Sequence, residues 1–224
     1  MARDWLLLEA FPEPETARLR FYDWSEPAFT FGYGQKWQAV KGAGLGAGEF
    51  IRRPTGGGLV DHRADWTYAL VLPPGHPLAA ARACESYRMV HEALAEALRS
   101  IGLDGRLQDE ACQSAIVGGA SSRKLVAACF EQAERFDIVR EDDGRKIAGA
   151  AQKRTKRGLL FQGSVDRRAV GELKNGGKLA ESFAQKLGVM LGARPKHYSE
   201  KPWAAAMVAE TTARFAAKEW NEKR

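Results

Sequence analysis

Cysteine is scarce in this sequence, and long apolar runs are absent. Only three of the 224 residues are cysteines, Cys84, Cys112 and Cys129, and none belongs to a Cys-x-x-Cys pair. An odd number of scattered cysteines argues against a disulfide framework and favours free thiols. No apolar run approaches the roughly 20 residues that span a bilayer, and the first residues lack a secretory signal. We therefore expect a cytoplasmic protein with no membrane partner.

Two kinds of ligand-binding pattern are also missing. The four histidines, His62, His76, His91 and His197, do not have the spacing of metal ligands, so no metal site is predicted. No GxxxxGK[ST] loop occurs. Residues 42–47 fit the loose pattern GxGxx(G/A), but a strand-like segment follows where a dinucleotide fingerprint requires a helix. We interpret these residues as a plain loop.

The charge balance is moderately basic. The chain has 34 lysines and arginines against 28 acidic residues, a formal net charge of +6. Such a balance favours an acidic partner without requiring nucleic acid. The basic clusters lack the interleaved aromatics of an RNA-binding sheet, so no nucleic-acid partner is predicted. The basic residues can be interpreted as a binding surface for an acidic protein partner, which is the more specific hypothesis. The alternative is an ordinary solvated surface.

The hydrophobic pattern predicts short strands that alternate with a few helices. Strands are predicted at 18–24, 49–52, 66–72, 135–139, 145–152 and 158–165, and helices at 82–101, 179–191 and 203–220. Gly102 ends the first helix, and Asp142-Asp143-Gly144 is a tight turn between two strands. Residues 104–124 fit no pattern. Because neither a repeat nor a linker occurs, one mixed domain over residues 1–224 is predicted.

The most informative segment runs from Arg52 to His62, where two arginines lead into three consecutive glycines. Each ordered glycine costs roughly 0.5–1 kcal/mol relative to alanine, so three in a row suggest that a ligand approaches the main chain closely. Arginines beside exposed N–H groups suit an anionic or strongly polar ligand. A flexible hairpin turn is the alternative.

The second informative segment runs from Gly144 to Arg154 and places Lys146 at the start of an apolar strand. Burial of an ammonium group is costly without a partner, and the small residues 148–151 leave room for a ligand. The alternative is a solvated lysine on an edge strand. Cys129 lies seventeen positions upstream of Lys146, and the residues alone favour an inert buried thiol there.

Together and in this order, the two segments resemble the catalytic domain shared by lipoate–protein ligases, biotin ligases and octanoyl- or lipoyl-transferases. The family pattern RRxTGGGxVxH corresponds to residues 52–62, a following TY pair to Thr67-Tyr68, and KIxGxAQxR to residues 146–154. Residues 19–27, 32–35 and 218–221 also resemble the lipoyl branch. The resemblance covers nearly the whole chain. It implies an α+β fold of mixed, mostly antiparallel sheets packed with helices.

Within this family the chain is most similar to the cysteine-dependent octanoyltransferase branch. Ala128-Cys129-Phe130 stands where that branch has its nucleophile, and Phe136-Asp137-Ile138 matches the triplet that follows. The resemblance implies transfer of an octanoyl or lipoyl group from acyl carrier protein, or from another lipoyl protein, through a cysteine thioester. The acceptor would be a lysine of a lipoyl domain, and no cofactor would be needed.

Two alternatives are kept. One is an ATP-dependent lipoate–protein ligase that uses ATP and magnesium and acts through lipoyl-AMP. The other is a non-catalytic module that binds lipoate or lipoyl domains.

The resemblance also implies the site residues. Cys129 and Lys146 would be catalytic, because a nearby ammonium favours the thiolate and can donate to the developing oxyanion. The substrate-binding positions would be Arg53, Thr55, Gly56, Gly57, Gly58, Leu59, Val60, His62, Gly149 and Ala150.

Three departures from the family pattern bear on details. The chain begins at a segment that another strand usually precedes. Gln162-Gly163 replaces a His-Gly pair. Leu59 replaces an alanine, which predicts a narrower acyl tunnel. Cys84 and Cys112 have no assigned role, and we expect both to be structural.

Overall fold

Two sheets and their covering helices form the fold. The computed structural model describes residues 1–109, 133–170, 176–198 and 202–223. The larger sheet has six strands, and all neighbouring pairs are antiparallel. In spatial order these strands are β1 (Arg18–Tyr22), β5 (Asp65–Leu72), β9 (Gly158–Asp166), β8 (Lys146–Thr155), β7 (Ile138–Arg140) and β6 (Gly105–Leu107). In the smaller sheet β2 (Ala28–Phe31) runs parallel to β3 (Glu49–Arg52) and antiparallel to β4 (Val60–Asp61).

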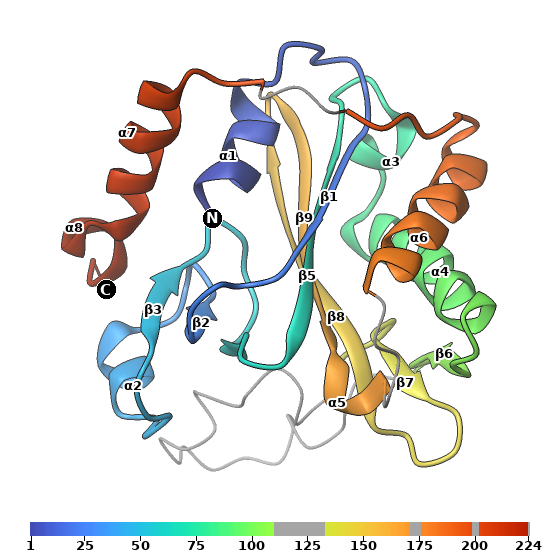
Figure 1. Ribbon diagram of the computed structural model, residues 1–224, viewed down its shortest axis with the longest axis horizontal. Helices are drawn as coiled ribbons and strands as arrows, with labels where there is room; N and C mark the ends of the chain where they lie inside the picture. The colour runs from blue at the N-terminus through green and yellow to red at the C-terminus, as the bar shows by residue number, and fades with distance from the viewer. Residues whose placement is uncertain (110–132, 171–175, 199–201, 224) are drawn as a thin grey trace.

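Helices cover both faces of the larger sheet (Figure 1). The helices are α1 (Ala2–Glu9), α2 (Trp37–Lys41), α3 (Pro77–Ala80), α4 (Ala83–Ser100), α5 (Arg167–Val170), α6 (Gly176–Leu191), α7 (Ala205–Ala216) and α8 (Lys218–Asn221). The pair α4 and α6 packs against one face, whereas α1 covers the opposite face and contacts α7. The predicted α+β class with mixed, mostly antiparallel sheets is therefore confirmed. Within the described residues, no helix is long and apolar enough to cross a membrane.

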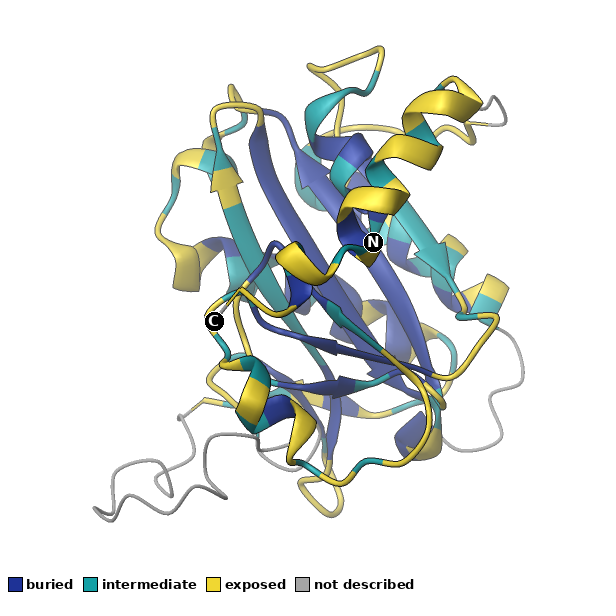
Figure 2. Cartoon of the chain, turned by 90° about the vertical axis from the view of Figure 1, so that its left-hand side faces the viewer, coloured by how far each residue is buried: buried dark blue, intermediate teal, exposed yellow. Residues whose placement is uncertain are grey.

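Strand β5, the second strand in the order of the larger sheet, is buried along its whole length. Much of this sheet is dark blue in Figure 2. Because side chains alternate along a strand, Trp66, Tyr68 and Leu70 join the core under α4 and α6, whereas Ala69 and Val71 pack against α1. This two-sided burial explains why the sequence shows a continuous apolar run there instead of an alternating one.

Among the described residues the longest helix is α4, and it follows its predicted range closely. Its buried positions recur at helical spacing and include Val90, Leu94 and Leu98. The helix ends two residues before Gly102, whose φ of 91° suits glycine. Residues 42–47 form a loop between α2 and β3, as expected.

Two predicted boundaries are wrong for identifiable reasons. The predicted helix at 203–220 is two helices, because Ala217 takes an extended conformation with ψ 140°. The predicted strand at 135–139 begins only at Ile138, because Phe136 has a φ of 68°. The sequence patterns also missed several short elements with no clear periodicity, namely α1, α2, α3, α5, β2, β4 and β6.

Arg52 joins the smaller sheet to the C-terminal helix α8. Its side chain is fully buried and donates to the carbonyl oxygens of Tyr33 and Gln35 at 2.8 and 2.7 Å. It also donates to the carbonyls of Trp220 and Asn221 at 3.1 and 2.8 Å. Because the helix breaks at Ala217, the carbonyls of Trp220 and Asn221 point toward the Arg52 side chain. These two hydrogen bonds favour the break over one continuous helix.

Replacement of Arg52 by methionine should lower the free energy of unfolding by at least about 3 kcal/mol, because four carbonyl oxygens lose a charged donor. Urea unfolding followed by circular dichroism measures the change. The matched control is Arg63→Met, since Arg63 is 48% exposed and pairs with Asp61 at the surface. That variant should stay within about 1 kcal/mol of the unsubstituted protein. Equal effects of the two changes would contradict the anchoring role of Arg52.

Candidate functional site

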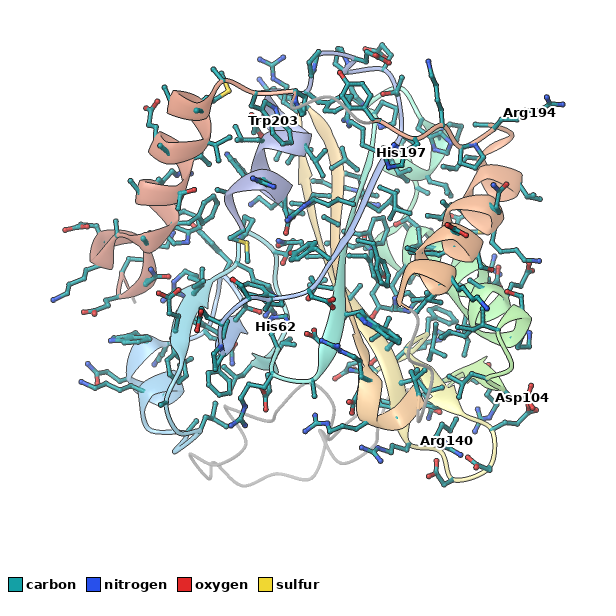
Figure 3. The ribbon with its side chains drawn as sticks, viewed as in Figure 1. His62, Asp104, Arg140, Arg194, His197 and Trp203 are labelled. Carbon is teal, nitrogen blue, oxygen red and sulfur yellow. The ribbon has the colours of Figure 1, made fainter. Side chains whose placement is uncertain are left out.

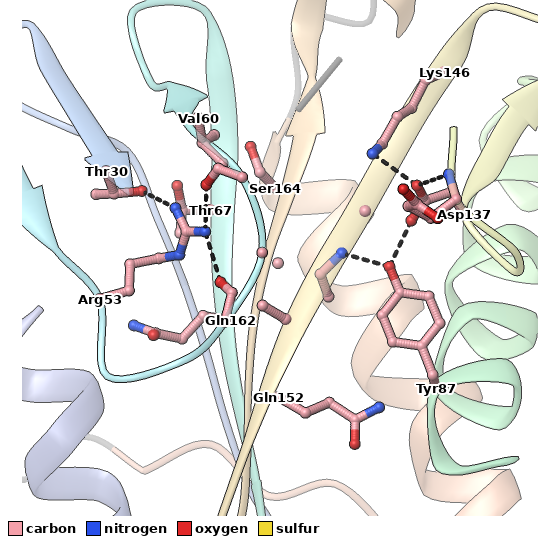
Figure 4. A pocket seen from close by; sticks show the side chains of 18 of the residues that line it. Thr30, Arg53, Val60, Thr67, Tyr87, Asp137, Lys146, Gln152, Gln162 and Ser164 are labelled. Atoms are coloured by element: carbon pink, nitrogen blue, oxygen red, sulfur yellow. Dashed lines mark hydrogen bonds and ion pairs between the residues drawn. The ribbon is translucent and has the colours of Figure 1, made fainter. Parts of the chain in front are cut away.

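A pocket of about 580 Å³ lies where the segment after β3 faces β8 and β9. It is within the usual size range of small-molecule sites. The residues that line it are Met1, Tyr22, Trp24, Thr30, Arg53, Gly56, Gly57, Gly58, Val60, His62, Thr67, Ala83, Cys84, Tyr87, Glu134, Arg135, Phe136, Asp137, Lys146, Gly149, Ala150, Ala151, Gln152, Gln162, Gly163 and Ser164. Arg53 and Thr30 stand on one side of it, and Lys146 with Asp137 on the other (Figure 4).

The glycine loop, residues 56–58, is held by Arg53. The guanidinium Nη2 donates to the carbonyl oxygens of Gly56 at 2.9 Å and of Gly58 at 2.7 Å. Gly57 has a φ of 84°, which glycine adopts easily. A side chain at Gly32 would lie 2.0 Å from the Gly57 carbonyl oxygen, so another backbone segment packs directly on the loop. The segment is thus an organised pocket wall.

Lys146 forms the opposite wall together with Asp137. The Lys146 Nζ lies 2.7 Å from Asp137 Oδ2, and the two side chains are 6% and 1% exposed. Asp137 Oδ2 also accepts from the Glu134 N–H at 2.7 Å. A Cβ atom at Gly149 would lie 2.9 Å from Lys146 Nζ and 2.9 Å from Asp137 Oδ1. Glycine at that position therefore makes room for the ion pair.

Tyr87 supports Asp137 from helix α4. Its hydroxyl donates to Asp137 Oδ1 and accepts from the Ala150 N–H at 2.8 Å. Burial and the negative charge of Asp137 raise the pKa of Tyr87 well above its ordinary value, so the phenol keeps its proton. Both oxygens of Asp137 are thus engaged, and Oδ2 forms the ion pair with Lys146.

His91 fixes the backbone bend that brings Asp137 to this place. Burial lowers the pKa of His91, so the ring is neutral at pH 7. Its Nδ1 donates to the Phe136 carbonyl at 2.6 Å, and its Nε2 accepts from the Tyr68 hydroxyl at 3.2 Å. The positive φ of Phe136 is therefore stabilised from the core of the larger sheet.

A second polar row lies behind the wall that carries Arg53. The Arg53 Nη1 donates to Thr30 Oγ1 at 2.8 Å, and Thr30 Oγ1 lies 2.7 Å from His62 Nε2. The His62 Nδ1 lies 2.7 Å from Asp65 Oδ2. The Trp24 ring stacks on His62 with 4.5 Å between ring centroids.

Gln162 occupies the place where the family pattern has a histidine, and it ties the loop to α1. The Thr55 hydroxyl donates to Gln162 Oε1 at 3.0 Å, and Gln162 Nε2 donates to Asp4 Oδ2 at 2.9 Å. Gln162 is 6% exposed. Its amide therefore gives the buried Thr55 hydroxyl an acceptor and adds a second donor to Asp4 Oδ2, which also accepts from the Tyr22 hydroxyl.

The structure brings most of the predicted site residues together. Arg53, Gly56, Gly57, Gly58, Val60, His62, Lys146, Gly149 and Ala150 all line the pocket. Cys129 lies outside the described residues.

Two predicted site residues have other positions. The Thr55 side chain is buried against Gln162. Leu59 is 1% exposed and packs with Phe29, Phe31 and Val40 in the core of the smaller sheet. The expectation that Leu59 narrows an acyl tunnel is therefore corrected, because its side chain points into this core.

Several pocket residues were missed in the sequence. Nothing in the sequence marks Tyr87 as a pocket residue beyond its place in the helical pattern of α4. Asp137 could have been sought as the acidic partner that a buried Lys146 requires. Cys84 was expected to be structural, but it is an exposed thiol that lines the pocket.

The histidines do not gather. His62 lines the pocket, whereas His197 follows α6 in the chain and lies well above His62 in Figure 3. Within the described ranges no group of three or more His, Cys, Asp or Glu side chains could hold a metal ion.

Comparison with known proteins gives three results. The family described as "Lipoyl protein ligase A/B catalytic domain" matches residues 1–169. A curated octanoyltransferase LipM of Geobacillus kaustophilus is 37% identical over 174 residues, which cover 74% of this chain and 59% of that protein. The LipM of Bacillus subtilis is 33% identical over 153 residues, which cover 66% of this chain and 52% of that protein. The chain thus spans little more than half the length of these relatives.

The fold is also similar to solved lipoate–protein ligases. A lipoate–protein ligase A bound with ATP gives a TM-score of 0.67 at 20% identity and covers 99% of this chain and 92% of that one. A bipartite lipoate protein ligase from Thermoplasma acidophilum gives 0.67 at 19% identity, with 99% and 89% covered. At these identities the similarity shows the fold alone.

Proposed function

Because the chain belongs to the family of the lipoyl protein ligase A/B catalytic domain, we propose that it transfers octanoyl or lipoyl groups in protein lipoylation. The family resemblance read from the motifs is confirmed by the match over residues 1–169. The donor would be an acyl thioester of acyl carrier protein, or of another lipoyl protein. The acceptor would be a lysine of a lipoyl domain.

One observation carries the proposal: a buried, ion-paired ammonium shares a pocket with the glycine loop. Lys146 and Gly56–Gly58 line the same cavity. A fixed positive charge in a desolvated pocket is a strong donor to an oxygen that becomes negative during acyl transfer. Asp137 and Tyr87 hold that charge in place before the substrate arrives.

The first half-reaction would use Cys129 as nucleophile. Its thiolate would attack the thioester carbonyl, and Lys146 would donate to the oxyanion that forms. The carrier thiol would then leave, and the acyl group would remain on Cys129. In the second half-reaction the lysine amine of the lipoyl domain would attack this new thioester. The net charge of +6 suits acidic protein partners.

The ATP-dependent ligase is the alternative, and it would need magnesium, which carboxylates bind. The pocket-lining carboxylates among the described residues are those of Asp137 and Glu134. Both oxygens of Asp137 already accept hydrogen bonds, one of them from Lys146. This donor set fits the cofactor-free transferase better. The LipM relatives, at 33% and 37% identity, support the same choice.

The proposal is tested by mass spectrometry of the intact protein after incubation with octanoyl-acyl carrier protein in the absence of ATP. We expect one added octanoyl group, which hydroxylamine removes and which peptide mapping locates at Cys129. Protein that gains no octanoyl group, but lipoylates a lipoyl domain when lipoate and ATP are supplied, would establish the ligase instead. Retained lipoate binding with neither reaction would indicate the non-catalytic module. A single domain over residues 1–224 and a cytoplasmic location belong to the same proposal.

A further inference from the structure

The turn between β8 and β9 carries positive charge that has no task in the two half-reactions above. Residues 152–165 include no acidic side chain and four basic ones, Lys153, Arg154, Lys156 and Arg157. The last three are exposed, and within the described residues none of them forms an ion pair. By contrast, Arg145 and Arg168 at the opposite end of these strands both pair with Asp166. The turn is therefore basic without a local counterion.

The pocket opens beside this hairpin. Among the residues that line it, 56–57, 83–84 and 134–135 are exposed and mark its opening. Gln152 also lines the pocket, and its Nε2 donates to the Ala83 carbonyl at 2.9 Å. Thr155, the last residue of β8, comes three positions later, which is roughly 10 Å along a strand. The basic turn thus begins a short distance from the opening.

Arg154 and Arg82 continue the positive charge from the turn to the opening. The Arg154 Nε donates to the Ala79 carbonyl at 3.1 Å, and its Nη2 donates to the Ala81 carbonyl at 2.7 Å. Because these carbonyls are neutral, they leave the charge of the guanidinium uncompensated. Arg82 is exposed and directly precedes Ala83, which lines the pocket. In the described part of the chain Arg82 forms no ion pair either.

We define the basic rim as Arg82, Arg154, Lys156 and Arg157. Lys153 is not part of it. Successive side chains of a strand point to opposite faces, so Lys153 faces away from Arg154, and its Nζ lies 5.4 Å from the centre of the Tyr33 ring. The basic rim therefore forms one surface that runs from the pocket opening to the end of the hairpin.

We propose that the basic rim binds the acidic carrier protein that delivers the acyl group. This inference rests on the proposed function and assigns a surface to its donor. Four positive side chains without acidic partners attract a negatively charged protein. Such complementarity raises the rate of association and fixes the orientation of the partner.

The position of the basic rim fits the donor better than the acceptor. The acyl group of a carrier protein lies at the end of a long flexible prosthetic arm, whereas the acceptor lysine is a single side chain. A domain that presents one side chain has to sit over the opening itself. The basic rim begins at the opening with Arg82 and extends away from it to Lys156 and Arg157. A carrier protein bound there can reach the pocket with its arm.

The test compares the carrier protein with a thioester that has no protein attached. In the double variant Lys156→Glu with Arg157→Glu, kcat/KM for octanoyl-acyl carrier protein should fall at least about tenfold, because electrostatic steering raises association rates by about this factor or more. High salt should reduce the difference from the unsubstituted protein. The rate with octanoyl-pantetheine, which lacks the protein, should not change. Thiol release measures both reactions.

A binding measurement gives a readout apart from activity. The probe is octanoyl-acyl carrier protein in which an amide replaces the thioester, so that no transfer occurs. Its Kd should rise at least about tenfold in the double variant, for the same electrostatic reason. If that variant folds poorly, Arg82→Glu provides a second test at the other end of the basic rim and should also raise this Kd.

The matched control is the double variant Lys41→Glu with Lys218→Glu, which changes the net charge by the same amount. Both lysines are exposed and do not line the pocket. They belong to α2 and α8, which lie away from the upper end of β8 and β9 in Figure 1. This variant should bind the amide probe as tightly as the unsubstituted protein does.

Four results would overturn the proposal. These are unchanged binding of the probe in the hairpin variant, equal losses in the hairpin and control variants, an equal loss with octanoyl-pantetheine, and slower transfer to the lipoyl domain with an unchanged donor step. The last result would assign the surface to the acceptor. An unsubstituted protein that binds the probe through the basic rim but takes no octanoyl group from the carrier would instead contradict the proposed function.

Discussion

Replacement of Cys129 by serine should reduce octanoyl transfer without ATP by roughly three orders of magnitude or more, because a hydroxyl is a far weaker nucleophile than a thiolate. The substitution changes one atom and keeps the side chain small, so the fold should be retained. The measurement is the rate at which octanoyl-acyl carrier protein modifies a lipoyl domain, followed by mass spectrometry.

The same variant distinguishes the two chemistries when lipoate and ATP are supplied. A ligase that acts through lipoyl-AMP does not need a cysteine nucleophile, so Cys129→Ser would keep its activity. The transferase predicts that ATP restores nothing. Full activity of Cys129→Ser with octanoyl-acyl carrier protein would remove the thioester step from the proposal.

Replacement of Lys146 by methionine should lower the rate of acyl-enzyme formation by about 10²–10³, the range found when one oxyanion donor is removed. Methionine keeps the length and apolar character of the lysine stem, so the change isolates the ammonium group. A stopped-flow measurement of carrier-protein thiol release gives the rate. Activity within a factor of three of the unsubstituted protein would contradict the proposed role.

In Lys146→Met, an effect on stability has to be distinguished from an effect on catalysis. Loss of one partner from a buried ion pair costs about 3–5 kcal/mol, and Asp137 would be left charged and 1% exposed. The double variant Lys146→Met with Asp137→Asn removes both charges and should recover much of that stability. It should stay as inactive as the single variant. Recovery of activity together with stability would show that Lys146 is only structural.

Lys153→Met is the matched control for this experiment. Lys153 belongs to the same strand, β8, but does not line the pocket. The same substitution there should leave acyl-enzyme formation nearly unchanged. A comparable loss of rate would point to an effect of any methionine in β8.

Much of the pocket could be predicted from local sequence. Three consecutive glycines after an arginine suggested a close backbone approach, and the structure shows Gly57 at positive φ beside the backbone of Gly32. The small residues after Lys146 suggested free space, and Gly149 does make room for the ion pair. Such features are visible because they depend on the backbone of a few adjacent residues.

The partners of these residues could not be predicted in the same way. Tyr87 reaches Asp137 from a helix that comes fifty residues earlier in the sequence. Arg52 looked like part of the ligand site, yet it binds carbonyls 168 and 169 residues away. Neither hydrophobic periodicity nor a turn signal in the sequence indicates contacts between residues so far apart. The single domain and the roles of the site residues stay predictions.

The family, the main buried strands and the two segments that face each other across the pocket were predictable from the sequence, because these depend on local backbone and apolar patterns. The pairing of the buried charges became visible only in the folded chain. In the fold, Lys146 forms an ion pair with Asp137, and the Leu59 side chain packs in the core of the smaller sheet. His62 lies between Thr30 and Asp65. The physical reason is that a buried polar group is stable only where the whole fold supplies its partner.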